Sequence, residues 1–327
     1  MVRTGSHGYL KYGFEGSTYA GSATVNKKFG LQDRLTTLTL TNNRINLPAL
    51  NKNTIDQFAY GQQQGTASVG FVLSNPWIFG AVLGAPSTTG SSNPYTHTYP
   101  HASNGLNKEP RTVQIEVGLD GASADIVRTL KGGVVNSLNI SASVGGIIEC
   151  TTDVTYGKET APSTSLGTAP VKPASEFPYT FAHAELTVGG ATVVQCQEAS
   201  INFTQNTELL YGLNSHAAVS SYRRVLDMTG SFKASLINKS LLEKVLEQVK
   251  AGTSSGTYSE TIGGSPEFRL TFIKDNTNEK ITITGSGLAI TDHSVSGFEP
   301  VEPIFEEINW QFKTVTIAAL NSESAEE

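Results

Sequence analysis

Residues 200–206 read Ser-Ile-Asn-Phe-Thr-Gln-Asn, and residues 37–43 read Thr-Leu-Thr-Leu-Thr-Asn-Asn. In both stretches apolar and polar side chains alternate, which gives a β-strand one apolar and one polar face. The stretches lie 163 positions apart, and the matching residues are Leu38 with Ile201, Leu40 with Phe203, and Asn43 with Asn206. We therefore expect a mainly β fold in which one structural unit occurs twice.

Two further blocks repeat at nearly the same spacing. The alternating strand after Gly65 matches the strand after Gly230, 165 positions later. A short apolar stripe with helical spacing follows in each half, and the stripes match at 164 positions: Trp77, Ile78, Ala81 and Val82 with Leu241, Leu242, Val245 and Leu246. A proline at the first helical position and a capping box are expected to start these helices, at Pro76 and Ser240. The prediction from these repeats is two tandem, mainly β domains, each with a short helix.

Composition suggests where the two units separate. A Pro-, Ser-, Thr- and Gly-rich segment at residues 159–175 is typical of a linker or an exposed crossover. We predict five parts: an N-terminal arm at 1–30, a first domain at 31–158, the linker at 159–175, a second domain at 176–320, and a disordered acidic tail at 321–327.

Composition and charge also exclude several classes of protein. The 327 residues carry 23 basic and 29 acidic side chains, a net charge of −6, which disfavours a nucleic-acid-binding protein. Two cysteines, Cys150 and Cys196, cannot form a disulfide framework. No apolar run is long enough to span a membrane, and the N-terminal residues lack the apolar segment of a signal peptide. We therefore expect a soluble protein that is made in a cytoplasm.

No catalytic, cofactor or metal site is predicted. The six histidines form no zinc-protease pattern, and the one close pair, His97 and His101, lies in a Pro-rich loop. Neither a dinucleotide-binding fingerprint nor a nucleophile elbow is present. We expect both cysteines to be buried, apolar residues of strands.

Two long insertions interrupt the paired strands, at residues 42–64 and 205–228. Loops of this length in a compact domain are uncommon and usually functional. Both insertions carry apolar side chains, which need a partner to cover them. These are Ile45, Leu47, Leu50, Ile55, Phe58 and Tyr60 in the first, and Leu209, Leu210, Tyr211, Val219, Tyr222 and Leu226 in the second.

The order of elements in the second half resembles the major tail tube proteins of long-tailed double-stranded DNA viruses of bacteria or archaea. The resemblance rests on a hairpin at 181–195, the strand at 200–206, a long loop, the stretch Thr-Gly-Ser-Phe-Lys-Ala-Ser-Leu at 229–236 and a helix. Residues 138–159 and 177–190 also resemble the middle of that family, whereas residues 1–30 match nothing we can assign.

This resemblance implies two tandem tail-tube β-sandwich domains, each with a short flanking helix. It also implies a structural virion protein whose inner sheets join edge to edge into a ring-wide barrel. The rings stack into the hollow tail through which viral DNA passes into the host. Double-domain members resemble trimers with pseudo-six-fold symmetry, and a hexameric ring is the alternative. Expected partners are further copies, tape-measure and tail terminator or baseplate proteins, and passing DNA, but no membrane. The polar strand faces would line the lumen: Thr37, Thr39, Thr41, Ser68, Ser200, Asn202, Thr204, Ser231, Lys233 and Ser235.

By the same resemblance, the two insertions reach the next ring. Their apolar residues would be buried there, with Arg44, Arg223 and Arg224 available to acidic neighbours. A carbohydrate-binding or adhesin-like sandwich of a virion or cell surface is the alternative function, with Tyr60, Tyr95 and Tyr99 as loop aromatics. The tube of a contractile secretion or injection device would share the fold, but its subunits are usually single-domain. An enzyme is the least favoured interpretation.

Overall fold

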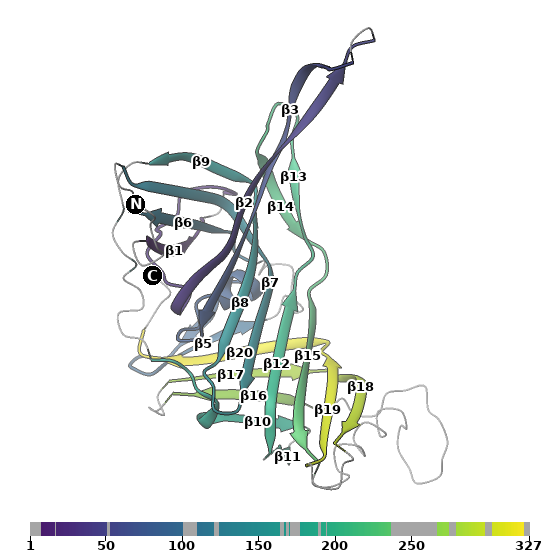
Figure 1. Cartoon of the computed structure of the whole chain (residues 1–327). Helices are drawn as coiled ribbons and strands as arrows, with labels where there is room; N and C mark the ends of the chain where they lie inside the picture. The colour runs from purple at the N-terminus through teal and green to yellow at the C-terminus, as the bar shows by residue number, and fades with distance from the viewer. Residues whose placement is uncertain are drawn as a thin grey trace.

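The computed structural model describes residues 8–16, 18–50, 53–100, 110–120, 124–163, 167, 170, 177–188, 191–193, 195–236, 267–274, 279–297 and 303–323. Within these residues the chain is mostly β-strand, with a short helix α1 (Phe79–Leu83) and a 3-10 turn η3 (Phe181–His183). Two large antiparallel sheets pack face to face, and the strands of the smaller sheet cross behind the lower part of the larger one (Figure 1).

The main path of the larger sheet is built from eight strands. They are β2 (Leu31–Pro48), β3 (Ile55–Val72), β7 (Ile126–Ser143), β8 (Glu149–Tyr156), β12 (Cys196–Thr204), β15 (Asp227–Ser235), β18 (Ala289–Ser296) and β19 (Phe305–Gln311). Their order across the sheet is β18-β19-β15-β12-β7-β8-β3-β2. Three more strands lie beside the first part of β7. β6 (Val113–Leu119) and β9 (Lys158–Ser163) pair with β7, and β1 (Gly8–Phe14) pairs with β6.

This path contains the same four-strand order twice, β2-β3-β8-β7 and then β12-β15-β19-β18. The strand ends coincide, because β3 ends at Val72 and β15 ends 163 positions later at Ser235. A β-bulge follows Val135 in β7, and another follows Ile290 in β18, 155 positions later. The two repeats join where β7 pairs with β12. The repeated unit expected from the sequence is therefore present as a repeated sheet.

The smaller sheet also draws strands from both halves of the chain. Its strands are β4 (Ser87–Thr89), β5 (Tyr95–Pro100), β10 (Ala184–Val188), β11 (Ala191–Thr192), β16 (Phe268–Ile273), β17 (Lys280–Ser286) and β20 (Thr314–Asn321). The order is β11-β10-β16-β17-β20-β5-β4, so β5 of the first half pairs with β20 of the second. The predicted hairpin around residues 189–190 is present as β10 and β11.

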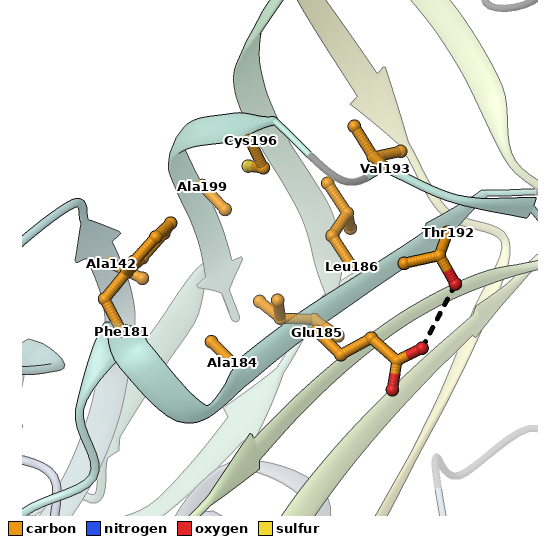
Figure 2. Close-up of a pocket in the computed structure, with 10 residues that line it drawn as sticks. Ala142, Phe181, Ala184, Glu185, Leu186, Thr192, Val193, Cys196 and Ala199 are labelled. Carbon is orange, nitrogen blue, oxygen red and sulfur yellow. Dashed lines mark hydrogen bonds between the residues drawn. The ribbon is translucent and has the colours of Figure 1, made fainter.

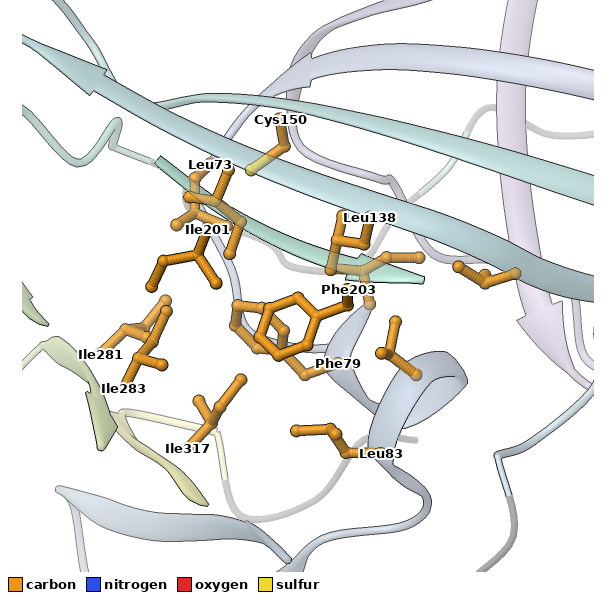
Figure 3. Close-up of a cluster of buried hydrophobic side chains, with 14 of the residues drawn as sticks. Leu73, Phe79, Leu83, Leu138, Cys150, Ile201, Phe203, Ile281, Ile283 and Ile317 are labelled. Atoms are coloured by element: carbon orange, nitrogen blue, oxygen red, sulfur yellow. The ribbon is translucent and has the colours of Figure 1, made fainter. Parts of the chain in front are cut away.

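The two sheets and α1 enclose one apolar core (Figure 3). Ile201 and Phe203 project into it from the larger sheet, and Ile281 and Ile317 from the smaller one. Phe79 of α1 fills the space between them. Removal of this apolar surface from water is the main term that holds the sheets together.

Helix α1 begins three residues after the predicted start at Pro76, because residues 76–78 form a turn. Gln205, a fully buried residue of the second half, donates from Nε2 to the carbonyl oxygens of Ala81 and Val82 at 3.3 and 3.2 Å. These bonds satisfy carbonyl groups that a helix end leaves unpaired. The helix predicted at residues 240–249 lies outside the described residues.

The two insertions, which were expected to be long loops, contain paired strands. β2 and β3 stay paired across residues 42–64 until Pro48 faces Ile55. The second insertion forms a separate two-stranded sheet of β13 (Thr207–Tyr211) and β14 (Ala218–Arg223). A ladder gives every second backbone group a partner, which the weak side-chain pattern of these stretches did not reveal.

Three segments outside the two predicted domains make specific contacts in their described parts. In the N-terminal segment β1 pairs with β6, and at the start of the predicted linker β9 pairs with β7. In the predicted tail, Asn321 ends β20, and the carboxylate of Glu323 accepts a hydrogen bond from Trp77 Nε1 at 3.0 Å. These partners are distant in sequence, so local composition could not indicate them.

Gly230 provides a test of the sheet geometry. A Cβ there would lie 2.1 Å from the Trp310 ring and 2.3 Å from the Ser200 carbonyl oxygen, which cannot move freely. We expect Gly230→Ala to lower the free energy of unfolding by about 1–3 kcal/mol, measured by chemical denaturation. Gly16→Ala is the control, because no atom lies within 4 Å of its Cβ position. Equal losses in the two variants would contradict this packing.

Candidate functional site

One face of the larger sheet is polar across its width. Ladder neighbours connect the two repeats on this face, because Ser200 lies opposite both Ser141 and Ser231. All ten residues predicted to line a lumen have side chains on this face, and none of them is buried: Thr37, Thr39, Thr41, Ser68, Ser200, Asn202, Thr204, Ser231, Lys233 and Ser235. Whether they line a lumen remains a prediction.

The same face carries six carboxylates that the sequence argument did not identify. They are Glu149, Asp153, Glu198, Asp227, Asp292 and Glu307. Asp153, for example, lies opposite Ser68, and Asp292 lies opposite Asn309. Alternation along each strand would have suggested these positions, but the pairing of strands β8, β18 and β19 was needed to place them on one face.

Two cations among the described residues of this face lie beside carboxylates. Arg34 forms an ion pair with Glu149 at 3.7 Å. Lys233 lies in register between Glu198 and Glu307 on the neighbouring strands, and its ammonium group sits 5.0 Å from the centre of the Phe305 ring. The face therefore combines hydroxyl and amide groups with an excess of negative charge.

Strands β2 and β18 form the two ends of the main path. Within the described residues, neither has a ladder partner on its outer side. An unpaired strand edge presents a row of backbone donors and acceptors that a further strand can join. These two edges are therefore available for assembly with another chain.

The outer parts of β2 and β3 project from the body as a two-stranded arm, residues 42–64 (Figure 1). Its apolar side chains are exposed, with Tyr60 at 80 % and Phe58 at 58 %. Ile45, Leu47, Leu50 and Ile55 are exposed as well, and Arg44 lies 5.8 Å from the Phe58 ring. An exposed apolar surface of this kind is typical of a protein contact.

The β13–β14 hairpin supports the base of this arm. The Tyr211 hydroxyl donates a hydrogen bond to the backbone carbonyl oxygen of Gln63 at 2.9 Å. The backbone N–H of Gln63 donates to the backbone carbonyl oxygen of His216 at 2.8 Å. The rings of Tyr60 and His216 meet edge to face at 5.9 Å. The second insertion thus holds the first one in position.

The residues of the second insertion that were predicted to contact the next ring fall into two groups. Leu226 belongs to the core, Tyr211 bonds the arm, and Leu209 and Arg223 are half-buried. Leu210, Tyr222 and Arg224 are exposed, although Arg224 and the Tyr222 hydroxyl both contact the carboxylate of Glu208. Part of this hairpin therefore has an internal role, and only its outer residues can meet another molecule.

A small cavity of about 230 Å³ opens between the sheets near β10 and β12 (Figure 2). Its lining is mainly apolar, including Phe181, Leu186 and Val193, and its polar contact is a 3.1 Å hydrogen bond from Thr192 to Glu185. Cys196 also faces the cavity, and burial raises the pKa of its thiol to about 11. Burial likewise raises the pKa of Cys150, so neither thiol is activated as a nucleophile.

His97 has a structural role. His97 is buried between Thr88 Oγ1 at 2.8 Å and Asn321 Oδ1 at 2.9 Å. His101 lies outside the described residues. The described residues contain no group of three or more potential metal ligands. None of the described helices is long and apolar enough to cross a membrane.

A repeated sheet with two open edges, one polar face and a projecting apolar arm defines a self-assembling structural protein. The chain belongs to the phage tail tube protein family, whose model matches residues 5–312. It is thus a component of the virion tail, where it forms the tube that conducts viral DNA. No curated protein matches the chain, and the carbohydrate-binding alternative has no support.

Gly61 tests the geometry of the arm. A Cβ at Gly61 would lie 1.7 Å from the Asn43 carbonyl oxygen, at the bulge where β2 and β3 leave the body. We expect Gly61→Val to disrupt the outer ladder while the body stays folded. Hydrogen exchange should show faster exchange at residues 55–60 with unchanged protection in β12 and β15. Gly212→Ala in the neighbouring hairpin is the control, and unaltered protection of the arm in Gly61→Val would contradict the assignment.

Proposed function

We propose that three copies of this chain close into a ring with pseudo-six-fold symmetry and that the rings stack into the tail tube. The observation that carries this proposal is the internal β7–β12 junction, which joins two copies of the same four-strand unit. The two open-edge strands correspond to the two junction strands, because β18 is the equivalent of β7 and β2 is the equivalent of β12. Pairing of β18 with β2 of the next copy would continue the pattern with no new kind of contact.

Three chains would contribute 24 strands, three times the eight of the main path. Barrel diameter grows with strand number, and barrels of about 16–18 strands already leave an aqueous channel. Closure would also remove both open edges, which otherwise expose the protein to aggregation. A ring of six chains is the alternative.

The polar face would line the bore. DNA binding gains its affinity from lysine and arginine residues that contact phosphates and release counterions. On this face Arg34 is paired with Glu149, and Lys233 lies between two carboxylates. The carboxylates would repel phosphates within a Debye length of about 8 Å. DNA would therefore pass without binding, and no step of this function needs catalysis.

The arm would contact the next ring, where its exposed apolar residues become buried. The outer residues of the second hairpin, Leu210, Tyr222 and Arg224, would join this contact. Tape-measure and tail terminator or baseplate proteins are the proposed further partners, as in the family the sequence resembles. Synthesis and assembly would take place in the cytoplasm of a bacterial or archaeal host.

Deletion of the arm tests the stacking contact. We expect the purified full chain to form hollow filaments with a stacked repeat in negative-stain electron microscopy. Replacing residues 45–62 by an Asn-Gly turn should leave a folded protein that forms no filaments, because the ring-to-ring contact is lost. The control carries Gln57→Asn and Gln64→Ser, which keep the arm and its apolar residues. Filaments of normal length from the deletion variant would contradict the role of the arm, and compact particles from the full chain at every concentration would contradict the tube.

Cross-linking tests the ring. Asn139 faces Asn202 at the internal junction, and the repeat spacings of 155 and 163 residues place Ser294 opposite Thr39 of the next copy. In a Cys196→Ser background, Thr39→Cys with Ser294→Cys should give disulfide-linked species up to three chains.

Asn139→Cys with Asn202→Cys is the matched control, because it should cross-link within one chain. Thr41→Cys with Ser294→Cys, shifted by two residues, should cross-link far less. A ladder that continues to six chains would favour the hexamer. Equal cross-linking of the shifted pair would contradict the register.

A further inference from the structure

The edge strand β18 carries an ionisable pair on its core-facing side. His293 Nε2 lies 3.3 Å from Glu306 Oε2 of β19, and the two side chains are 13 % and 2 % exposed. Neither residue faces the polar surface of the sheet, because Ser294 and Glu307, their chain neighbours, do. A carboxylate this deeply buried requires a compensating partner, and His293 supplies it.

The internal junction has apolar residues at the equivalent positions. By the strand registers, His293 corresponds to Leu138, 155 positions earlier, and Glu306 corresponds to Cys150, 156 positions earlier. Leu138 and Cys150 are both buried in the core. The residues that follow keep the same alternation of polar and apolar side chains, since Leu-Asn-Ile-Ser at 138–141 corresponds to His-Ser-Val-Ser at 293–296. The second repeat therefore has an ionisable pair at the open edge, where the first repeat has an apolar pair at the internal junction.

The register of the proposed ring places a large apolar residue against this pair. At the internal junction Leu138 faces Phe203, and both are fully buried. The equivalent of Phe203 is Leu40, which is 38 % exposed at the open edge of β2. Closure of the ring would set Leu40 of one copy against His293 of the next and would remove the remaining water from the pair.

We propose that the His293–Glu306 pair restrains ring closure, so that the open edge stays soluble until assembly begins. This inference rests on the proposed ring. Core-directed charges on an edge strand oppose unwanted pairing. An ion pair that is desolvated on association usually contributes less than apolar residues of similar volume. The β18–β2 junction between chains is therefore weaker than the β7–β12 junction within a chain.

Restoring apolar residues tests the proposal. His293→Leu/Glu306→Val makes the edge resemble the internal junction. We expect the lowest concentration at which the full chain forms sedimentable filaments to fall about tenfold, which corresponds to about 1.4 kcal/mol per junction. Filament identity is checked by negative-stain microscopy.

The control is Thr271→Val/Thr282→Leu, which adds apolar area at a facing pair of β16 and β17 in the smaller sheet, away from the proposed ring junction. We expect its assembly concentration to stay within about twofold of the unmodified chain. If the control falls as far as the test variant, general hydrophobicity explains the effect and the restraint is contradicted.

A second variant keeps the test decisive if the double substitution does not fold, as judged by circular dichroism. Glu306→Gln retains a hydrogen-bonding group beside His293 and removes the buried ionisable carboxyl group. We expect the lowest concentration at which Glu306→Gln forms filaments to be at least about threefold below that of the unmodified chain. An unchanged or higher concentration in the folded variant overturns the restraint. Absence of filaments from the unmodified chain, together with absence of the disulfide cross-link in the Thr39→Cys/Ser294→Cys variant, would instead contradict the proposed ring.

Discussion

The antiparallel junction between β7 and β12 is the contact on which the rest of the molecule depends. On its core side Ile140 faces Ile201, and on its polar side Asn139 faces Asn202. This pairing makes one sheet out of two repeats, aligns their polar faces and leaves β2 and β18 as the ends. Without it, the two four-strand units would each have an additional open edge, and the polar face would be interrupted at its centre.

The continuous face combines neutral polar residues with carboxylates, and several of them are bonded to neighbours on the sheet. Hydroxyl and amide groups pair across strands, as Ser200 does with Ser231 at 3.0 Å between oxygens. The carboxylates are partly engaged by neighbours, since Ser137 donates to Asp153 at 2.7 Å and Gln311 to Asp227 at 2.6 Å. The side chains are thus held on the sheet, and negative charge remains as the net electrostatic property of the surface.

The sequence allowed the strands, the repeat and the polar face to be predicted, because alternation at Leu38 and Ile201 depends only on local periodicity. It did not allow the arm to be recognised as a ladder, since residues 42–64 alternate weakly and their order comes from pairing. The carboxylates of β8 and β19 required the register, which a single sequence does not contain. The support of Gln63 by Tyr211 joins positions 148 residues apart, and no local signal indicates it.

The two repeats differ in their insertions, and this difference has a structural consequence. In the first repeat the hairpin strands continue outward as one 18-residue pair. In the second, β12 ends at Thr204 and the chain forms β13 and β14, which lean against the first arm. A two-stranded arm with both faces in water is marginal by itself. The second insertion therefore stabilises the first, so that a single well-positioned apolar arm per chain results from two copies of one unit.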